Sequence, residues 1–263
     1  MPAAAFDLQG HRGARGLAPE NTLAAFRTAL DLGVTTLETD LAVTKDDVVV
    51  ISHDPLLNPD LVRGPDGQWI APPARRSARS PWPSSSATTS AGSIRRASYA
   101  QQFPEQKPAD GERFPTLAEL FADGGPGRCA STSRSRPIRP KPDAHARSRH
   151  ASRSSAVEAI RAGQGRRAHA RIQSFDWRGA DRGAAASRPR SPPACLTIES
   201  NNMDTVGRAS GRPSPWLGGL DLAAQGGSVP RLAKAAGLRH LVAVLAQRHG
   251  RQRQREPTRW ASR

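Results

Sequence analysis

The sequence is poor in aromatic residues, in cysteine and in long apolar runs. Only 5% of its 263 residues are Phe, Tyr or Trp, and only two are cysteine. Cys129 and Cys195 lie 66 positions apart, so no C-x-x-C pair supports a zinc site or a redox dithiol. No run of about 18 apolar residues exists, so we expect no transmembrane helix. The N-terminus also lacks the basic and apolar regions of a leader peptide, so we expect a cytoplasmic protein, or a periplasmic one if a leader was lost.

Acidic residues are scarce outside the first quarter of the chain. The formal net charge is +16, but residues 1–70 carry five Lys/Arg against ten Asp/Glu, a balance of −5 that leaves +21 for the other 193 residues. Residues 71–98 and 124–168 are dominated by Arg, Ser, Ala and Pro and show no usable apolar period. We therefore expect one domain over residues 1–237 that these two segments interrupt, followed by a basic, disordered tail over 238–263.

The positive charge leaves a second interpretation open, that of a nucleic-acid-binding module. Lys/Arg-rich surfaces bind phosphate backbones through counterion release. Here the basic residues are scattered among Ser and Pro, few aromatic side chains are present for base stacking, and we find no recognisable binding motif. We therefore expect no specific nucleic-acid partner and interpret the basic segments as charged, disordered stretches of the chain.

The amino-acid composition of the basic segments suggests how they arose. A GC-rich coding strand read out of frame tends to yield Arg, Ser, Ala and Pro, and protein-like stretches resume between these segments. We hypothesise frameshifts in the gene or its sequencing, which would impair the product. Resequencing tests this hypothesis, and an unbroken frame that encodes these same residues and yields a folded product would refute it.

The first seventy residues combine the patterns of strands with that of a helix. The predicted strands cover residues 6–10, 34–41 and 48–51. Between the first two, apolar residues recur at i, i+3 and i+7, Asn21 or Thr22 can cap a helix, and Gly33 can end it. Strands that alternate with helices are typical of an α/β protein with a parallel sheet.

Three later stretches also have protein-like patterns. Thr116 and Glu119 form a capping box that predicts the start of a helix. Residues 170–177 are typical of a strand end. Ser228 can cap a last helix, which Gly237 would close.

Two carboxylates in the first quarter have the spacing of a cation site. Glu38 and Asp40 are two positions apart on a predicted strand, so both side chains leave the same face. Hard divalent cations prefer such oxygen ligands. An acidic strand end in solvent would have the same pattern, and the spacing leaves both interpretations open.

Two histidines follow apolar runs in the same region. His11 and His53 each come after a predicted strand, where the side chains of a barrel reach the catalytic rim. Imidazole can give or take a proton near neutral pH, and the adjacent Arg12 can hold phosphate oxygens in a bidentate manner. Together these residue types favour phosphate-ester chemistry.

Five short motifs then resemble the glycerophosphodiester phosphodiesterase family in order and spacing. They are Gly10-His11-Arg12-Gly13, Ala18-Pro19-Glu20-Asn21-Thr22, Leu37-Glu38-Thr39-Asp40, Val43-Thr44-Lys45-Asp46 and Ser52-His53-Asp54. The resemblance implies a TIM (β/α)₈ barrel that hydrolyses a small glycerophosphodiester to an alcohol and glycerol 3-phosphate. It implies His11 and His53 as general acid and base, Arg12 on the phosphate, and Glu38 and Asp40 as ligands of a divalent metal, Ca²⁺ or Mg²⁺. Other barrel phosphodiesterases, such as phospholipase D-like toxins, also use paired histidines, but the Pro19–Thr22 segment favours this family.

The chain departs from the family pattern in two places. A third metal carboxylate is expected soon after Phe121, where residues 128–134 contain no acid. The late Trp-Thr-Val-Asn-like strand expected after Gly237 is not found either. We therefore expect a barrel that is incomplete or disrupted after its first three strands, and an enzyme that is impaired or inactive.

Overall fold

The structure, a computed structural model, describes residues 8–44, 48–53, 58–64, 66–70, 98–123, 128–132, 158, 171–177, 194–199, 203–238 and 240–245. Its strands are β1 (Gln9–His11), β2 (Thr36–Val43), β3 (Val49–Ile51), β4 (Arg128–Thr132), β5 (Arg171–Ser174), β6 (Ala194–Glu199) and β7 (His240–Leu245). Its helices are α1 (Leu23–Asp31), α2 (Ser98–Gln102), α3 (Leu117–Ala122) and α6 (Val229–Ala235), with 3₁₀ turns at Pro215–Leu217 and Ala223–Gln225. Within these ranges no helix has the length and apolarity needed to cross a membrane.

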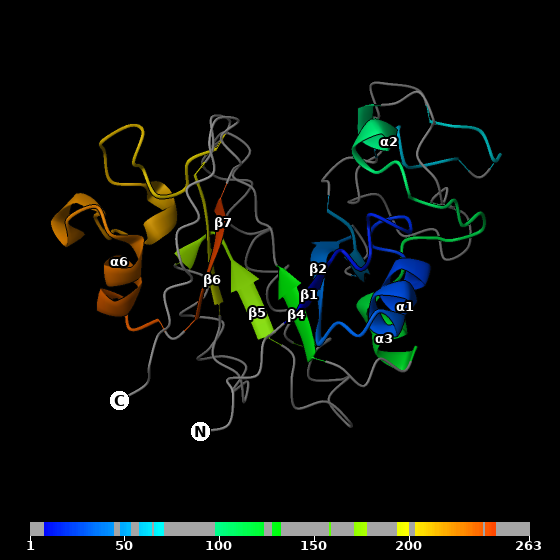
Figure 1. The fold of residues 1–263 in the computed structure, drawn as a ribbon, viewed down its shortest axis with the longest axis horizontal. Coiled ribbons are helices and arrows are strands. Elements are labelled where there is room, and N and C mark those ends of the chain that lie inside the picture. Colours follow the sequence, from blue (N-terminus) through cyan, green and yellow to red (C-terminus); the bar gives the residue numbers. More distant parts are fainter. Residues whose placement is uncertain are drawn as a thin grey trace.

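Six strands form one parallel sheet in the order β1-β2-β4-β5-β6-β7. Helices α1 and α3 lie at the β1–β2 end of this sheet, and α6 lies at the β6–β7 end (Figure 1). Strands that follow one another along the chain are thus neighbours in space, as in a barrel wall. Within the described ranges no pairing joins β1 to β7.

Strand β3 does not belong to the parallel wall, and our prediction of a third parallel strand was wrong. It runs antiparallel to β2, with Leu41 opposite Ile51 and Val43 opposite Val49. The connection between β2 and β3 spans only residues 44–48. A parallel crossover needs about a dozen residues or more, so a link of this length can form only a hairpin.

Two strands lie where we expected no regular structure. Strand β4 falls inside the second interrupting segment, where it pairs with β2 and β5. Strand β7 falls inside the expected tail, at the place where we found no family-like strand, and pairs with β6 along its whole length. The run Leu241–Leu245 is apolar and partly β-branched, which suits a pleated surface better than solvent. Apart from residues 158 and 238, the rest of both segments lies outside the described residues.

The predicted starts of three helices are confirmed. Thr22 caps α1, its hydroxyl accepting a hydrogen bond from the Ala25 N–H. Thr116 and Glu119 make the reciprocal hydrogen bonds of a capping box at α3. Ser228 caps α6, with a proline in its first turn. In each case a side-chain oxygen satisfies an N–H that the first helical turn leaves without a backbone partner.

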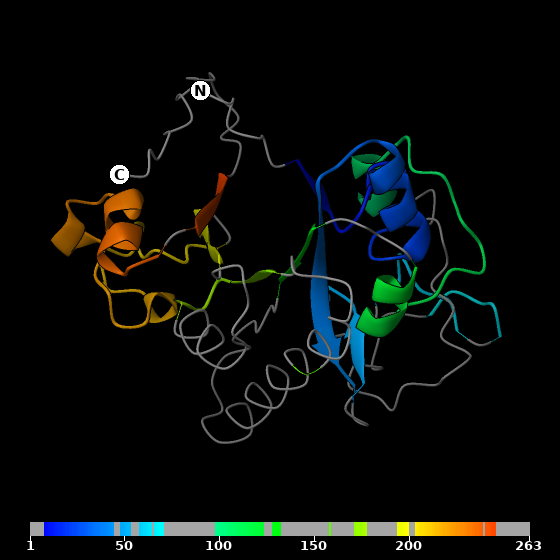
Figure 2. The same cartoon turned by 90° about the horizontal axis from the view of Figure 1, so that it is seen from below.

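The buried apolar side chains form two separate clusters. The first joins α1, β2, β3 and α3 and consists of Phe26, Ala29, Leu37, Val49, Ile51, Leu117 and Leu120. It lies at one end of the molecule, where α1 and α3 pack beside β2 and β3 (Figure 2). This cluster therefore packs α1, α3 and β3 against β2, the strand that carries Glu38 and Asp40.

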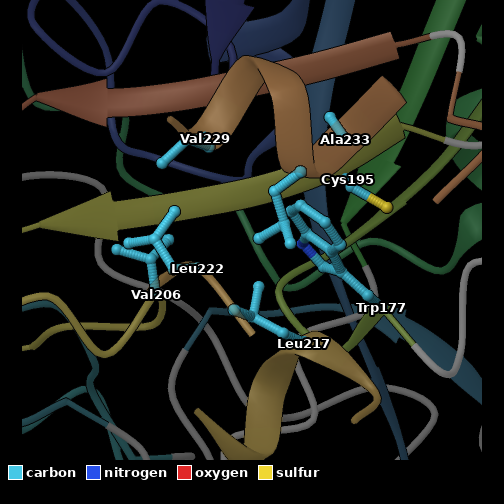
Figure 3. Close-up of a cluster of buried hydrophobic side chains, with 8 residues drawn as sticks. Trp177, Cys195, Val206, Leu217, Leu222, Val229 and Ala233 are labelled. Carbon is cyan, nitrogen blue, oxygen red and sulfur yellow. The ribbon is translucent and has the colours of Figure 1, made fainter. Parts of the chain in front are cut away.

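The second cluster lies at the other end of the sheet. It gathers side chains from after β5, from β6 and from α6, together with the loop between β6 and α6 (Figure 3). Its members are Trp177, Cys195, Val206, Leu217, Leu222, Val229, Leu232 and Ala233. The Trp177 indole is buried and donates its N–H to the Leu196 carbonyl at 3.2 Å, so its one polar atom is satisfied. The two clusters have no residue in common.

Candidate active site

Strands β1 and β2 bring three of the expected site residues together. His11 ends β1 in register with Glu38 of β2, and Asp40 follows two positions later on the same face. The His11 Nε2 lies 3.8 Å from Glu38 Oε2. The His11 side chain is 53% exposed, whereas that of Glu38 is 10% exposed. A histidine that solvent can reach therefore lies beside a buried carboxylate.

Arg12 lies in the loop after β1 with an uncommon backbone conformation. Its φ of 57° is left-handed, a region that costs a residue with a large side chain about 1–2 kcal/mol. The loop is held by hydrogen bonds from Arg12 N to Glu38 Oε2 at 3.1 Å and from Asn21 N to the Arg12 carbonyl at 3.0 Å. Strain of this kind is often found at functional sites. In this conformation the Arg12 side chain lies beside the buried carboxylates of Glu20 and Asp40.

The Arg12 guanidinium lies between two buried carboxylates. Its Nη1 donates to Glu20 Oε1 at 2.6 Å, and its Nε lies 3.3 Å from Asp40 Oδ2. Burial alone would lower the pKa of Arg12, but the charges of Glu20 and Asp40 raise it above its ordinary value. Arg12 therefore stays charged, and it compensates carboxylates that would be costly to bury alone.

Gly13 allows the loop to approach helix α1, and this gives a prediction. A Cβ on Gly13 would lie 2.7 Å from the Ala25 carbonyl carbon, whereas a Cβ on Gly33 would meet nothing within 4 Å. Both glycines have positive φ, 81° and 83°. We expect Gly13→Ala to lower the free energy of unfolding by about 1–3 kcal/mol more than Gly33→Ala does, because only Gly13 also adds a clash. Urea unfolding of both variants measures the difference, and equal losses would contradict the role of close packing.

His53 reaches the same region from the hairpin strand. It follows β3, and the preceding residue, Ser52, donates its backbone N–H to the Asp40 carbonyl at 3.0 Å. Our interpretation of His53 as the end of a parallel strand was wrong in topology, because β3 is antiparallel. The hairpin nevertheless places His53 next to the segment that carries Asp40. The neighbouring Asp54 lies outside the described residues.

Three further side chains contact the site. Gln173 of β5 donates its amide to Glu38 Oε1 at 3.2 Å, and Tyr99 of α2 donates its hydroxyl to Glu20 Oε2. From the sequence we assigned no role to Tyr99 or Gln173, and we considered Glu20 only as part of the Pro19–Thr22 segment, which we expected to shape the loop around the site. Glu20 stands inside a family-like motif and Gln173 at a predicted strand end, so their positions were noted but their contacts were not. The Tyr99–Glu20 contact joins residues 79 positions apart, and no local pattern predicts it.

The described site offers a divalent cation two carboxylates, Glu38 and Asp40. Strand β4 pairs beside them with Ala130 opposite Glu38 and Thr132 opposite Asp40, and neither supplies an acid. Within the described ranges no three His, Cys, Asp or Glu residues are grouped to hold a metal ion. Proteins commonly hold Mg²⁺ by one or two carboxylates plus water and substrate phosphate, whereas Ca²⁺ takes about six to eight oxygens. The donor set present therefore fits Mg²⁺ better than Ca²⁺.

Short stretches of the chain are similar to curated proteins. Human lysophospholipase D GDPD1 is 52% identical over 44 residues, which are 17% of this chain and 14% of that protein. Human glycerophosphoinositol inositolphosphodiesterase GDPD2 is 51% identical over 47 residues, which are 18% of this chain and 9% of that protein. The match thus spans less than a fifth of the length of these curated relatives.

The similarity to solved structures extends over almost the whole chain. A structure from Silicibacter pomeroyi, assigned to the glycerophosphoryl diester phosphodiesterases, has a TM-score of 0.70 at 23% identity and covers 93% of this chain and 83% of its own. A phosphodiesterase of Oleispira antarctica, in complex with the product sn-glycerol-3-phosphate, has a TM-score of 0.52 at 18% identity, with 91% and 84% covered. At these identities the likeness is one of fold, and it confirms the TIM-barrel class.

A sequence profile provides the test of family membership. The profile of the glycerophosphoryl diester phosphodiesterase family matches residues 11–204, which is more than half of the chain. That range includes the histidines, the arginine and the carboxylates of the candidate site. The chain therefore belongs to the glycerophosphoryl diester phosphodiesterase family.

Proposed function

We propose that the chain hydrolyses glycerophosphodiesters to an alcohol and glycerol 3-phosphate with the help of a divalent cation. The observation that carries this proposal is the cluster where β1 ends beside β2, in which His11, Arg12, Glu38 and Asp40 lie together. Membership of the family supports the reaction class. The phosphodiesterase of Oleispira antarctica, similar in fold, was solved with sn-glycerol-3-phosphate, which supports a small-molecule substrate of this kind.

His11 and His53 are the general acid and base in this proposal. One histidine accepts the proton of the attacking oxygen. Attack by water yields glycerol 3-phosphate directly, whereas attack by the substrate's own glycerol hydroxyl yields a cyclic phosphate that water opens in a second step. The other donates a proton to the leaving alkoxide. The exposed imidazole of His11 suits either role, because substrate can reach it. The charge of Arg12 offsets the negative charge of the phosphoryl oxygens.

Glu38 and Asp40 would hold the cation, Ca²⁺ or Mg²⁺, of which Mg²⁺ fits the donor set better. A bound cation would supply positive charge at the phosphoryl oxygens. Glu38 already accepts hydrogen bonds from Arg12 and Gln173, so its orientation is fixed before a ligand binds. Ionised carboxylate oxygens keep further lone pairs for a cation beside such hydrogen bonds. With two carboxylates in place of three, we expect an impaired enzyme.

The test is hydrolysis of glycerophosphocholine by the full chain, followed as release of glycerol 3-phosphate. We expect release that needs Mg²⁺, stops with a chelator and is slower than the ordinary enzymatic range, which begins at about 1 s⁻¹. Asp40→Asn should lower the release, whereas Asp123→Asn, at a carboxylate paired with Arg27, should not. Release that ignores the chelator would contradict the role of the metal, and a turnover within the ordinary range would contradict impairment. No release with any divalent cation would refute the proposed function.

A further inference from the structure

The buried Arg12 is held by more than the two proposed metal ligands. Its side chain is 10% exposed, and the Glu20 side chain that accepts its Nη1 at 2.6 Å is 5% exposed. Glu20 thus pairs with Arg12 in a place that water hardly reaches. Two of the three guanidinium nitrogens, Nε and Nη1, face carboxylates. The third, Nη2, donates no hydrogen bond within the part of the chain that the structure describes.

A second side chain supports Glu20 from a distant part of the sequence. The Tyr99 hydroxyl donates to Glu20 Oε2 at 2.5 Å, so each oxygen of this carboxylate accepts one hydrogen bond. Burial raises the pKa of Tyr99, and the charge of Glu20 raises it further, so the hydroxyl remains a donor. Tyr99 therefore restricts Glu20 to the orientation in which its other oxygen faces Arg12.

The segment that carries Tyr99 is itself attached to the Arg12 loop. The Tyr99 and Phe103 rings are 5.0 Å apart, and the Arg15 guanidinium lies 4.9 Å from the centre of the Phe103 ring. Gln106 donates its amide to the Arg15 carbonyl at 2.7 Å. These contacts hold α2 and the residues after it against the loop. A chain of contacts therefore leads from α2 through Glu20 to Arg12 and ends at Asp40.

We propose that Glu20, braced by Tyr99, is a positioning residue that holds the Arg12 guanidinium against Asp40 and leaves Nη2 for a phosphoryl oxygen. A planar guanidinium binds phosphate oxygens through directional hydrogen bonds, so binding depends on the direction in which the group is held. The strained backbone of Arg12 fits this role, because strain persists only where the surrounding contacts enforce it. The inference rests on the proposed function, since it assumes that Arg12 contacts the phosphate group of substrate and product.

The test is binding of glycerol 3-phosphate to the full chain by calorimetry at constant Mg²⁺. We expect Glu20→Gln to weaken binding on the order of 10-fold, about the effect of losing one hydrogen bond to a charged group. Tyr99→Phe, which removes one hydroxyl and is the safer variant for folding, should weaken it a few-fold. The control Glu105→Gln changes an exposed glutamate near α2 and should leave binding unchanged.

A second background separates positioning from a general structural effect. In Arg12→Lys the planar group is gone, so adding Glu20→Gln should weaken binding no further. An equal loss in both backgrounds, or unchanged binding in both Glu20→Gln and Tyr99→Phe, would overturn the inference. If the unaltered chain neither binds glycerol 3-phosphate nor hydrolyses glycerophosphocholine, the proposed function fails, and the inference fails with it. Measurable binding and turnover in the unaltered chain, with unchanged binding in both Glu20→Gln and Tyr99→Phe, would refute the inference alone.

Discussion

Replacing His11 by alanine is expected to lower the turnover of glycerophosphocholine by about 10²–10⁴-fold, because positioned proton transfer contributes a factor of that size. His11 is the most accessible of the proposed catalytic groups, and its imidazole lies 3.8 Å from a Glu38 oxygen. The measurement is the rate of glycerol 3-phosphate release at saturating substrate and Mg²⁺. A rate within threefold of the unaltered chain would contradict a catalytic role for His11.

The exposure of His11 makes this variant a clean test of chemistry. A side chain that is half in solvent contributes little packing, so the free energy of unfolding should change by less than about 0.5 kcal/mol. If turnover falls strongly while urea unfolding is unchanged, the loss comes from the catalytic step and not from a loss of stability. His249→Ala is a suitable control, because we assign no role to His249, which lies outside the described residues. His53→Ala should show a loss similar to that of His11→Ala.

Local sequence patterns predicted α1, α3 and α6 because the ends of a helix depend on neighbouring residues, but they did not predict α2. Thr22, Thr116 and Ser228 each cap a helix as expected, and each hydroxyl bonds an N–H only three residues later. The proximity of His11 to Glu38 could also be predicted from the sequence. Once two parallel strands follow one another, side chains at their carboxyl ends meet at one edge of the sheet.

The direction of β3, the long-range contacts of the site and strands β4 and β7 depend on features that local sequence patterns do not contain. The β-branched run of β3 looks the same in a parallel and an antiparallel strand, and only the length of the preceding link distinguishes them. The contacts of Glu38 with Gln173 and of Glu20 with Tyr99 span 135 and 79 residues. Such contacts depend on how the chain folds back on itself, which no local period encodes. Strands β4 and β7 were missed because basic neighbours masked short stretches that could pair.

Replacing Phe26 by alanine is expected to lower the free energy of unfolding of the elements that the first cluster joins, α1, β2, β3 and α3, by about 3–5 kcal/mol. Phe26 is 1% exposed and packs with α3 and with β3 in that cluster. The second cluster has its own buried members and none of those of the first. We therefore expect the loss to stay local, which native-state hydrogen exchange can resolve segment by segment.

The two clusters then predict opposite patterns of exchange. Phe26→Ala should speed amide exchange in β3 and α3 and leave β6 and α6 nearly unchanged. Leu232→Ala, also at 1% exposure, should do the reverse, since Leu232 belongs to the second cluster. Strands β4 and β5 join the two ends by backbone pairing, and the two clusters share no residue, so we expect little coupling between their packing. If both variants sped exchange equally in all four elements, the sheet would behave as one cooperative unit and the independence of the clusters would be refuted.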